Sequence, residues 1–151
     1  MEISRRCAKK NVKLTTVYAD ITAPLYWWRE YCDFKTENDF SLIPFDRDFT
    51  LADFYYDNLN TLEVEHLKKT IELINCQRKA SMQEKDESWK HKIMQMLPLS
   101  YMLKGTVMLN YGTLTNMYFN KRFSYVREWT EFCEWIKTLP QSEEICRDRR
   151  K

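Results

Sequence analysis

The sequence predicts an α+β fold: one predominantly helical domain over residues 1–151 with a small antiparallel sheet. Apolar residues recur at helical spacing in several segments, which is the main signal for helices packed on a core. A run rich in β-branched and aromatic residues before Pro24 predicts a strand, and a second such run between Gly105 and Gly112 predicts a short strand or a tight turn. With 44% hydrophobic residues in 151, the chain has enough apolar area for a single core.

The N-terminal half is predicted to contain a strand, a buried helix and a long loop. The strand covers residues 12–21, and the helix opens at Leu25 because Pro24 precedes it. Residues 36–50 show no steady period and predict a loop, with Thr50 capping a short helix over 51–56.

Helical spacing predicts further helices along the rest of the chain. The longest is expected to be capped by Thr61 and to end near Ser81, and the last to be capped by Ser124. Their apolar faces are, in chain order, Val64, Leu67, Ile71, Ile74 and Arg78; Trp89, Ile93 and Met96; Leu114, Met117 and Tyr118; and Tyr125, Trp129, Phe132 and Ile136.

Charge gives no argument for a nucleic-acid or membrane partner. The formal net charge is only +2, and basic residues concentrate in tails at about 1–10 and 146–151, while acidic residues dominate 30–65. We interpret these as solvated tails and a solvated face. Without an apolar run long enough for a signal peptide or a membrane span, the protein is expected to be cytoplasmic.

Cysteine, histidine and glycine usage excludes several kinds of site. The five cysteines are odd in number and widely spaced, which indicates free thiols rather than a disulfide framework or a metal centre. His66 and His91 stand apart and are expected at the surface. With only two glycines in the chain, a glycine-rich phosphate loop or dinucleotide fingerprint is excluded.

Two sets of residues resemble a group of small proteins carried by phages and mobile elements that look like divergent, truncated relatives of flavin-dependent thymidylate synthases. The first set runs over 20–30 (DITAPLYWWRE), and the second comprises residues 97–100, 106–111 and 128–136. The resemblance implies a synthase-like fold lacking the first strand and helix of the synthases, a homo-oligomer, and FAD as the cofactor.

The resemblance also implies a flavin or nucleotide site. The synthase strand and Arg-His-Arg helix fall on residues 14–35, and the Leu-Pro segment with its later Asn and Arg falls on Leu97, Pro98, Asn110 and Arg122. The implied contacts are Arg29, Lys35, Asn110 and Arg122, with Trp28 as a stacking surface.

The chain departs from the synthase pattern where the anion should bind. Asp33-Phe34-Lys35 stands where the synthases have Arg-His-Arg, which places a carboxylate near the expected phosphate. Two like charges in contact repel by about 1 kcal/mol even in water. The nucleotide loop is reduced to Ser41 in an acidic setting. We therefore expect a site remnant without thymidylate synthase activity.

The sequence leaves two other functions open. One is a phage-encoded, non-enzymatic interaction protein that inhibits a host defence complex. It is suggested by the acidic stretch over 30–65 and by an aromatic-rich segment containing Phe40, Phe45, Phe49, Phe54, Tyr55 and Tyr56. The other is that these aromatics close the core of a homo-oligomer.

Overall fold

The structure is a computed structural model of the chain, and it describes residues 2–8, 15–83 and 87–147. Its contacts divide the chain into two compact units. Unit 1 comprises Met1–Ser41 and Leu103–Lys151, and unit 2 comprises Leu42–Met102. The α+β class and the small antiparallel sheet predicted from the sequence are confirmed.

Unit 1 is built on a four-stranded sheet of order β1-β2-β4-β3. Its strands are β1 (Glu2–Ala8), β2 (Thr16–Pro24), β3 (Glu37–Phe40) and β4 (Met102–Asn110). The outer pairs β1–β2 and β3–β4 are antiparallel. The central pair is antiparallel as well, because Thr15 O accepts from Tyr111 N at one end while Asp20 accepts from Thr106 Oγ1 towards the other.

The strand predictions need four corrections. β1 lies within the segment that we interpreted as a solvated basic tail, and it pairs with β2. β4 begins at Met102 and ends at Asn110, whereas the predicted run extends from Gly105 to Gly112. β2 continues to Pro24, beyond the predicted end at residue 21, because Ala23 still points into the core, and residues 12–14 of the prediction lie outside the described residues. The segment 37–40 is a strand, β3, within the predicted loop. Its sequence Glu-Asn-Asp-Phe has little strand preference, so pairing with β4 determines its conformation.

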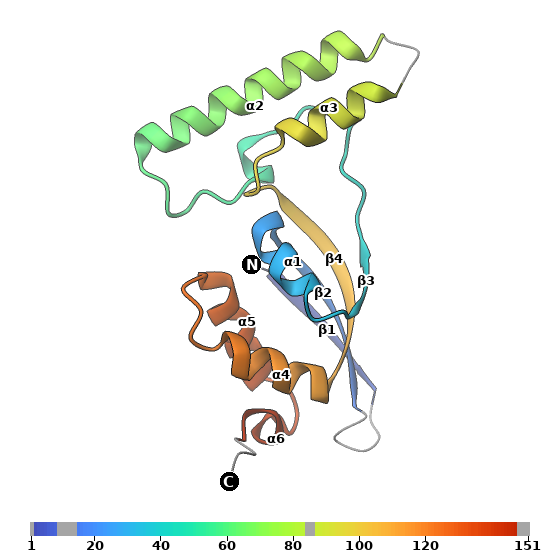
Figure 1. Cartoon of the computed structure of the whole chain (residues 1–151), viewed down its shortest axis with the longest axis vertical. Helices are drawn as coiled ribbons and strands as arrows, with labels where there is room; N and C mark the ends of the chain where they lie inside the picture. Colours follow the sequence, from blue (N-terminus) through green and yellow to red (C-terminus); the bar gives the residue numbers. More distant parts are fainter. Residues whose placement is uncertain (1, 9–14, 84–86, 148–151) are drawn as a thin grey trace. The chain divides into compact units, whose positions relative to one another are not determined.

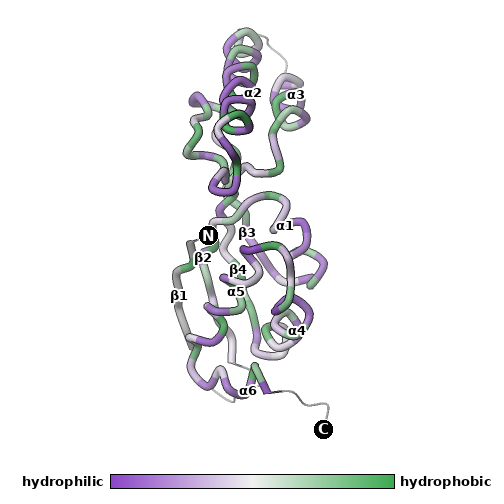
Figure 2. Tube along the Cα trace, turned by 90° about the vertical axis from the view of Figure 1, so that its left-hand side faces the viewer, coloured by the Kyte–Doolittle hydropathy of each residue, from purple (hydrophilic) through white to green (hydrophobic). Residues whose placement is uncertain are grey.

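Four helices of unit 1 lie on one face of the sheet (Figures 1 and 2). They are α1 (Leu25–Cys32), α4 (Tyr111–Lys121), α5 (Arg127–Lys137) and α6 (Ser142–Cys146). The start of α1 at Leu25 agrees with the prediction. The alternation of β2 sends Val17, Ala19 and Ile21 towards these helices, and all three are buried.

The start of α5 differs from the prediction. Its N-cap is Val126 rather than Ser124, so Tyr125 precedes the helix and is 97% exposed. The remaining members of the predicted stripe, Trp129, Phe132 and Ile136, are fully buried. The stripe is therefore one residue shorter than the spacing suggests.

The core of unit 1 is rich in aromatic rings from α1 and α5. Trp27 packs against Trp129 with ring centres 4.9 Å apart and against Phe132 at 5.6 Å. Trp28 packs edge-on against Phe40 at 4.8 Å, which joins α1 to the edge strand β3. The rings bury large apolar areas and so hold the helical layer to the sheet.

Unit 2 contains the 3-10 helix η2 (Leu51–Asp53) and the helices α2 (Thr61–Ser81) and α3 (Ser88–Met96). Thr50 is the N-cap of η2 as predicted, but the helix ends at Asp53 instead of residue 56. The N-cap of α2 is Asn60 rather than Thr61. The Oδ1 of Asn60 accepts a hydrogen bond from Glu63 N at 3.0 Å, and the Glu63 carboxylate accepts one from Asn60 N. The end at Ser81 agrees with the prediction.

Two of the six residues of the aromatic-rich segment that suggested an open interface, Phe49 and Phe54, belong to the core of unit 2, while Tyr56 is exposed. Phe49 and Phe54 are 2% and 3% exposed, and both pack against Tyr101, with ring centres 6.0 and 5.7 Å away. Asn75 of α2 pairs with the backbone of Phe49 through two hydrogen bonds of 2.8 Å. The backbone of Phe49 is thus fixed to α2.

Arg78, predicted on the apolar face of α2, is indeed buried, but it has a polar role. Its guanidinium forms an ion pair with Asp48, which also pairs with Lys79 at 2.8 Å. The hydrogen bonds from Lys79 and Arg78 hold the pKa of the Asp48 carboxyl below its usual value. The two cations anchor the loop before η2 to α2.

The remaining sequence predictions concern isolated residues. His66 and His91 are exposed, as predicted. Cys32, Cys76, Cys133 and Cys146 are free thiols, and Cys7 lies outside the residues whose side chains are described. Within the described ranges, no helix is long and apolar enough to cross a membrane.

Candidate functional site

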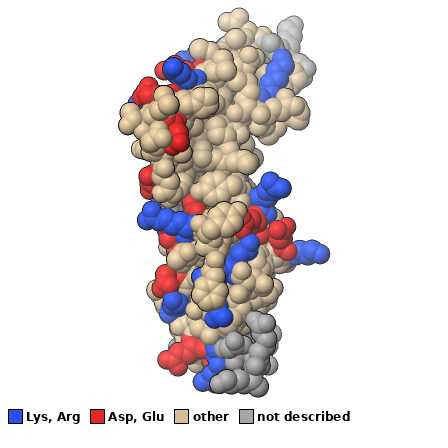
Figure 3. Space-filling model, turned by 60° about the vertical axis from the view of Figure 1, so that its left-hand side comes forward, with Lys and Arg blue, Asp and Glu red and all other residues tan. Residues whose placement is uncertain are grey.

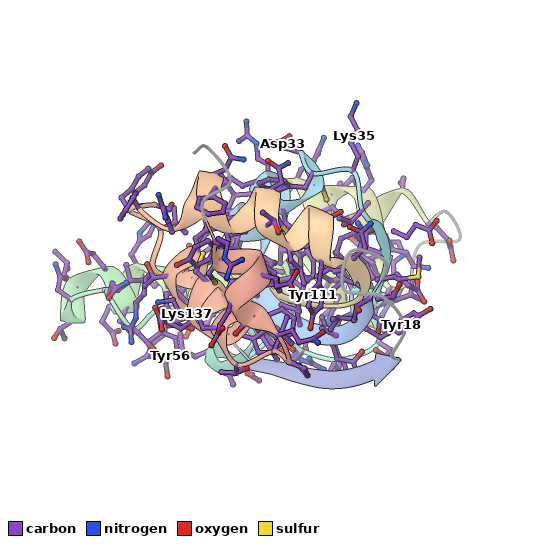
Figure 4. All side chains as sticks on the ribbon, turned by 90° about the horizontal axis from the view of Figure 1, so that it is seen from below. Tyr18, Asp33, Lys35, Tyr56, Tyr111 and Lys137 are labelled. Carbon is purple, nitrogen blue, oxygen red and sulfur yellow. The ribbon has the colours of Figure 1, made fainter. Side chains whose placement is uncertain are left out.

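The C-terminal end of α1 presents the charged residues that the resemblance singles out. Arg29 lies in the last turn, Asp33 is the C-cap, and Lys35 follows in the left-handed region with φ 52°. All three are exposed. Figure 4 shows Asp33 and Lys35 at the same edge of unit 1, with the Lys35 side chain pointing away from the ribbon. This end therefore offers two cations and one carboxylate to solvent.

Trp28, expected as a stacking surface, is part of the core. Its side chain is 3% exposed, and its Nε1 donates to Leu103 O at 2.9 Å. The indole contacts Phe40 and lies directly against Gly105. With its polar atom bonded and its faces covered, it offers no free surface for a planar ligand.

Asn110 and Arg122 bracket α4, so one chain does not bring them together. Asn110 is the N-cap, with its Oδ1 accepting from Thr113 N at 2.8 Å, and Arg122 is the C-cap. At about 1.5 Å per residue the helix holds them about 18 Å apart. A single phosphate cannot contact both residues of one chain.

Arg122 is packed among aromatic rings. Its guanidinium carbon lies 4.7 Å from the ring centre of Phe119, 4.8 Å from that of Phe123 and 5.9 Å from that of Tyr118. Such cation–π contacts stabilise a guanidinium at the surface by about 0.5–1 kcal/mol each. The cation predicted as a ligand contact thus already has partners within its own helix end.

A polar network that sequence reasoning missed joins α1, α4 and α5. Glu30 Oε2 accepts from Lys121 Nζ at 2.6 Å and from Trp129 Nε1 at 2.8 Å. Burial acts to raise the pKa of Glu30, but the bonds from Lys121 and Trp129 and the charge of Lys121 outweigh it, so the pKa is lowered. Glu30 and Lys121 lie 91 positions apart, and no local spacing signals the pair.

The same helices carry a buried carboxylate. Glu128 is 2% exposed and accepts a short hydrogen bond from Tyr26 Oη. Tyr26 and Glu30 are one turn apart on α1, as their i, i+4 spacing requires, so two polar links tie α1 to α5. Lys121 is neutralised by Glu30, whereas Arg29 and Lys35 form no ion pair with any residue in the described part of the chain.

The described residues contain no group of three or more His, Cys, Asp or Glu side chains placed to hold a metal ion. Basic and acidic groups are interspersed on the face shown in Figure 3.

Searches by sequence find no relative: no family model and no curated protein matches the chain. Solved structures do match. The structure of flavin dependent thymidylate synthase ThyX from Helicobacter pylori, complexed with FAD and dUMP, aligns with a TM-score of 0.54 at 13% identity, over 85% of this chain and 70% of that one. The fold is similar to that of flavin-dependent thymidylate synthases.

A second structure supports the same fold. The UMP/dUMP methylase PolB from Streptomyces cacaoi, bound with 5-Br UMP, aligns with a TM-score of 0.58 at 15% identity. The alignment covers 89% of this chain and 73% of that chain. At such low identity the likeness establishes the fold, while the residues of this chain must carry any argument about a site.

Proposed function

We propose that this chain is a divergent protein of the flavin-dependent thymidylate synthase fold that keeps a remnant of a flavin- or nucleotide-binding site and lacks full catalysis. The supporting observation is the match to structures bound to FAD and dUMP over 85% and to a nucleotide analogue over 89% of this chain. FAD is the proposed cofactor, and the protein is proposed to be cytoplasmic and to self-associate.

Arg29 and Lys35 are the proposed contacts for an anionic group of the ligand. Both are exposed at the end of α1, where the resemblance aligns the Arg-His-Arg segment. Asn110 serves as a helix cap and Arg122 is stacked on rings, so the proposal does not need them. FAD would supply hydride transfer if bound.

Asp33 is the proposed reason for the loss of catalysis. Its carboxylate is exposed between the two cations in the sequence, in the position where the synthases resembled here carry a basic residue. Repulsion of about 1 kcal/mol at contact distance in water lowers the affinity for a phosphate roughly fivefold. We propose that this weaker binding of a phosphate contributes to the loss of full catalysis.

Complementation of a thymidine-requiring bacterial strain tests the catalytic half of the proposal. We expect no growth without thymidine when this chain is expressed, and growth with an active synthase expressed in the same way. Growth supported by this chain would refute the loss of catalysis.

The absorbance spectrum of the purified protein with added FAD tests the binding half. Retention of a flavin band after desalting or a measurable equilibrium affinity supports the proposal. A colourless protein that takes up no added FAD would refute flavin binding and would favour the non-enzymatic interaction protein.

A further inference from the structure

Unit 2 carries an open groove along the first half of α2. The groove has a volume of about 880 Å³, and all nine of its lining residues belong to unit 2. Sites of about 300–1,000 Å³ that are mostly apolar, with a few polar groups, are typical of small-molecule binding. The apolar residues of the groove are Leu59, Leu62, Leu67 and Pro98. We call it the leucine groove.

Two of these leucines are open to solvent. Leu62, in the first turn of α2, is 80% exposed, and Leu59, just before the helix, is 40% exposed. Water solvates such side chains poorly, and covering them with an apolar group is favourable roughly in proportion to the area removed from water. The leucine groove therefore favours a ligand with an apolar chain.

The two carboxylates that line the groove already have partners. The Glu63 carboxylate accepts a hydrogen bond from Asn60 N at 2.8 Å, as part of the N-cap of α2. The Glu65 carboxylate forms an ion pair with Lys68 at 2.8 Å. Because both negative charges are bonded within unit 2, they give the groove little preference for a cationic ligand.

Lys69 is the cation that lines the groove. It is exposed and forms no ion pair with any residue in the part of the chain that the structure describes. His66 is three positions earlier and so on the same side of α2, and it also lines the groove and offers a ring N–H. At about 1.5 Å per residue, Lys69 lies about 10 Å along the helix from Leu62. A ligand that contacts both residues must carry an anionic group at one end of an apolar chain.

We propose that the leucine groove binds a long-chain carboxylate, with the carboxylate on Lys69 and the acyl chain along Leu62 and Leu59. An ammonium and a carboxylate form a charge-assisted hydrogen bond, and one unpaired cation suits one head group. A protein partner matches less well, because an interface between proteins uses about 20–30 residues a side and the groove has nine. The site goes beyond the proposed function, since none of its residues is a proposed flavin contact.

Equilibrium dialysis of the full chain against laurate, decanoate and octanoate, each below its micelle concentration, tests the proposal. We expect saturable binding of laurate, and binding about four- to fifteenfold weaker at each step of two methylene groups, because one buried methylene group is worth a factor of about two to four. Dodecyltrimethylammonium, which has the same chain length as laurate and a cationic head group, should bind more weakly. No saturable binding of laurate, or equal binding of the cation, would overturn the proposal.

Matched variants locate the site. Lys69→Gln should weaken laurate binding about fivefold through the loss of one charge contact, and Leu62→Ser should weaken it at least fourfold through the loss of apolar contact. Their controls, Lys92→Gln and Leu42→Ser, change an exposed lysine and a 93% exposed leucine outside the groove and should bind laurate as the wild type does. Equal losses in a variant and its control would contradict the assigned site, whether or not the protein binds flavin.

Discussion

The indole of Trp28 occupies the space that a side chain on Gly105 would need. A Cβ on Gly105 would lie 2.8 Å from Cη2 of Trp28, closer than carbon atoms approach each other, and the indole is fixed by its bond to Leu103 O at 2.9 Å. The absence of a side chain at residue 105 is what lets α1 pack directly on β4. This contact positions the end of α1, where the candidate site lies.

Gly105→Ala is therefore expected to destabilise the protein. Overpacking a filled core costs about 1–3 kcal/mol, because the added methyl group displaces a buried ring. Denaturant unfolding followed by circular dichroism measures the change. Gly112→Ala is the matched control: its Cβ would meet only the side-chain Oδ1 of Asn110, at 3.1 Å, and the change should stay within about 1 kcal/mol. Equal effects at both glycines would contradict the packing argument.

Trp129→Ala is expected to cost about 3–5 kcal/mol, because it leaves a cavity among Trp27, Phe34 and Phe132. Tyr125→Ala, from the same predicted stripe, should change the stability of dilute protein by no more than about 0.5 kcal/mol, since this side chain is 97% exposed. Thermal melting compares the two. A loss of a degree or two for Trp129→Ala would show that the ring is not core.

The Glu30–Lys121 pair should make stability depend on pH. The pKa of Glu30 is lowered from its ordinary 4.5 in the folded protein, so the pair stabilises the fold above that pH and the contribution is lost as the pH falls through the folded pKa. Glu30→Gln should be less stable than the wild type at pH 7, and the difference should shrink below about pH 4.5. Unfolding in urea at a series of pH values measures it. A difference independent of pH would show that the charge of Glu30 does not stabilise the fold.

All five cysteines are expected to be reduced, and a thiol titration of the denatured, unreduced protein should find five. In the native protein, exposed Cys76 should react well before Cys133, because burial raises the pKa of the Cys133 thiol to about 11. Fewer than five thiols after denaturation would reveal a disulfide and contradict the prediction.

Local signals predicted the elements whose ends are fixed by neighbouring residues. Pro24 marks the start of α1 at Leu25, and helical spacing identifies the buried residues Leu67, Ile71 and Ile74 of α2. The N-cap of α2 was predicted at Thr61 and lies one residue earlier, at Asn60. Asn60 and Glu63 have the spacing of a capping box, in which each side chain accepts a hydrogen bond from the backbone N–H of the other.

Features that depend on distant partners were not predictable from one sequence. β3 is a strand because β4 lies beside it, and Glu30 is bonded to residues brought close only by folding. Periodicity also placed Tyr125 on a helix that begins two residues later. For the candidate site, the resemblance pointed to the charged end of α1. The burial of Trp28 follows from packing, and the separation of Asn110 from Arg122 follows from the length of α4.

The affinity of the purified chain for FAD and dUMP, measured by equilibrium dialysis with the Asp33→Arg variant beside the wild type, tests the central claim most directly. We predict weak but saturable binding of at least one ligand by the wild type and weaker binding by Lys35→Ala. Asp33→Arg should bind roughly 30-fold more tightly, because it removes a repulsion and adds an attraction of about 1 kcal/mol each. Absence of binding in both the wild type and Asp33→Arg, or affinities that none of these changes alters, would contradict the claim that the end of α1 is the remnant of a synthase site.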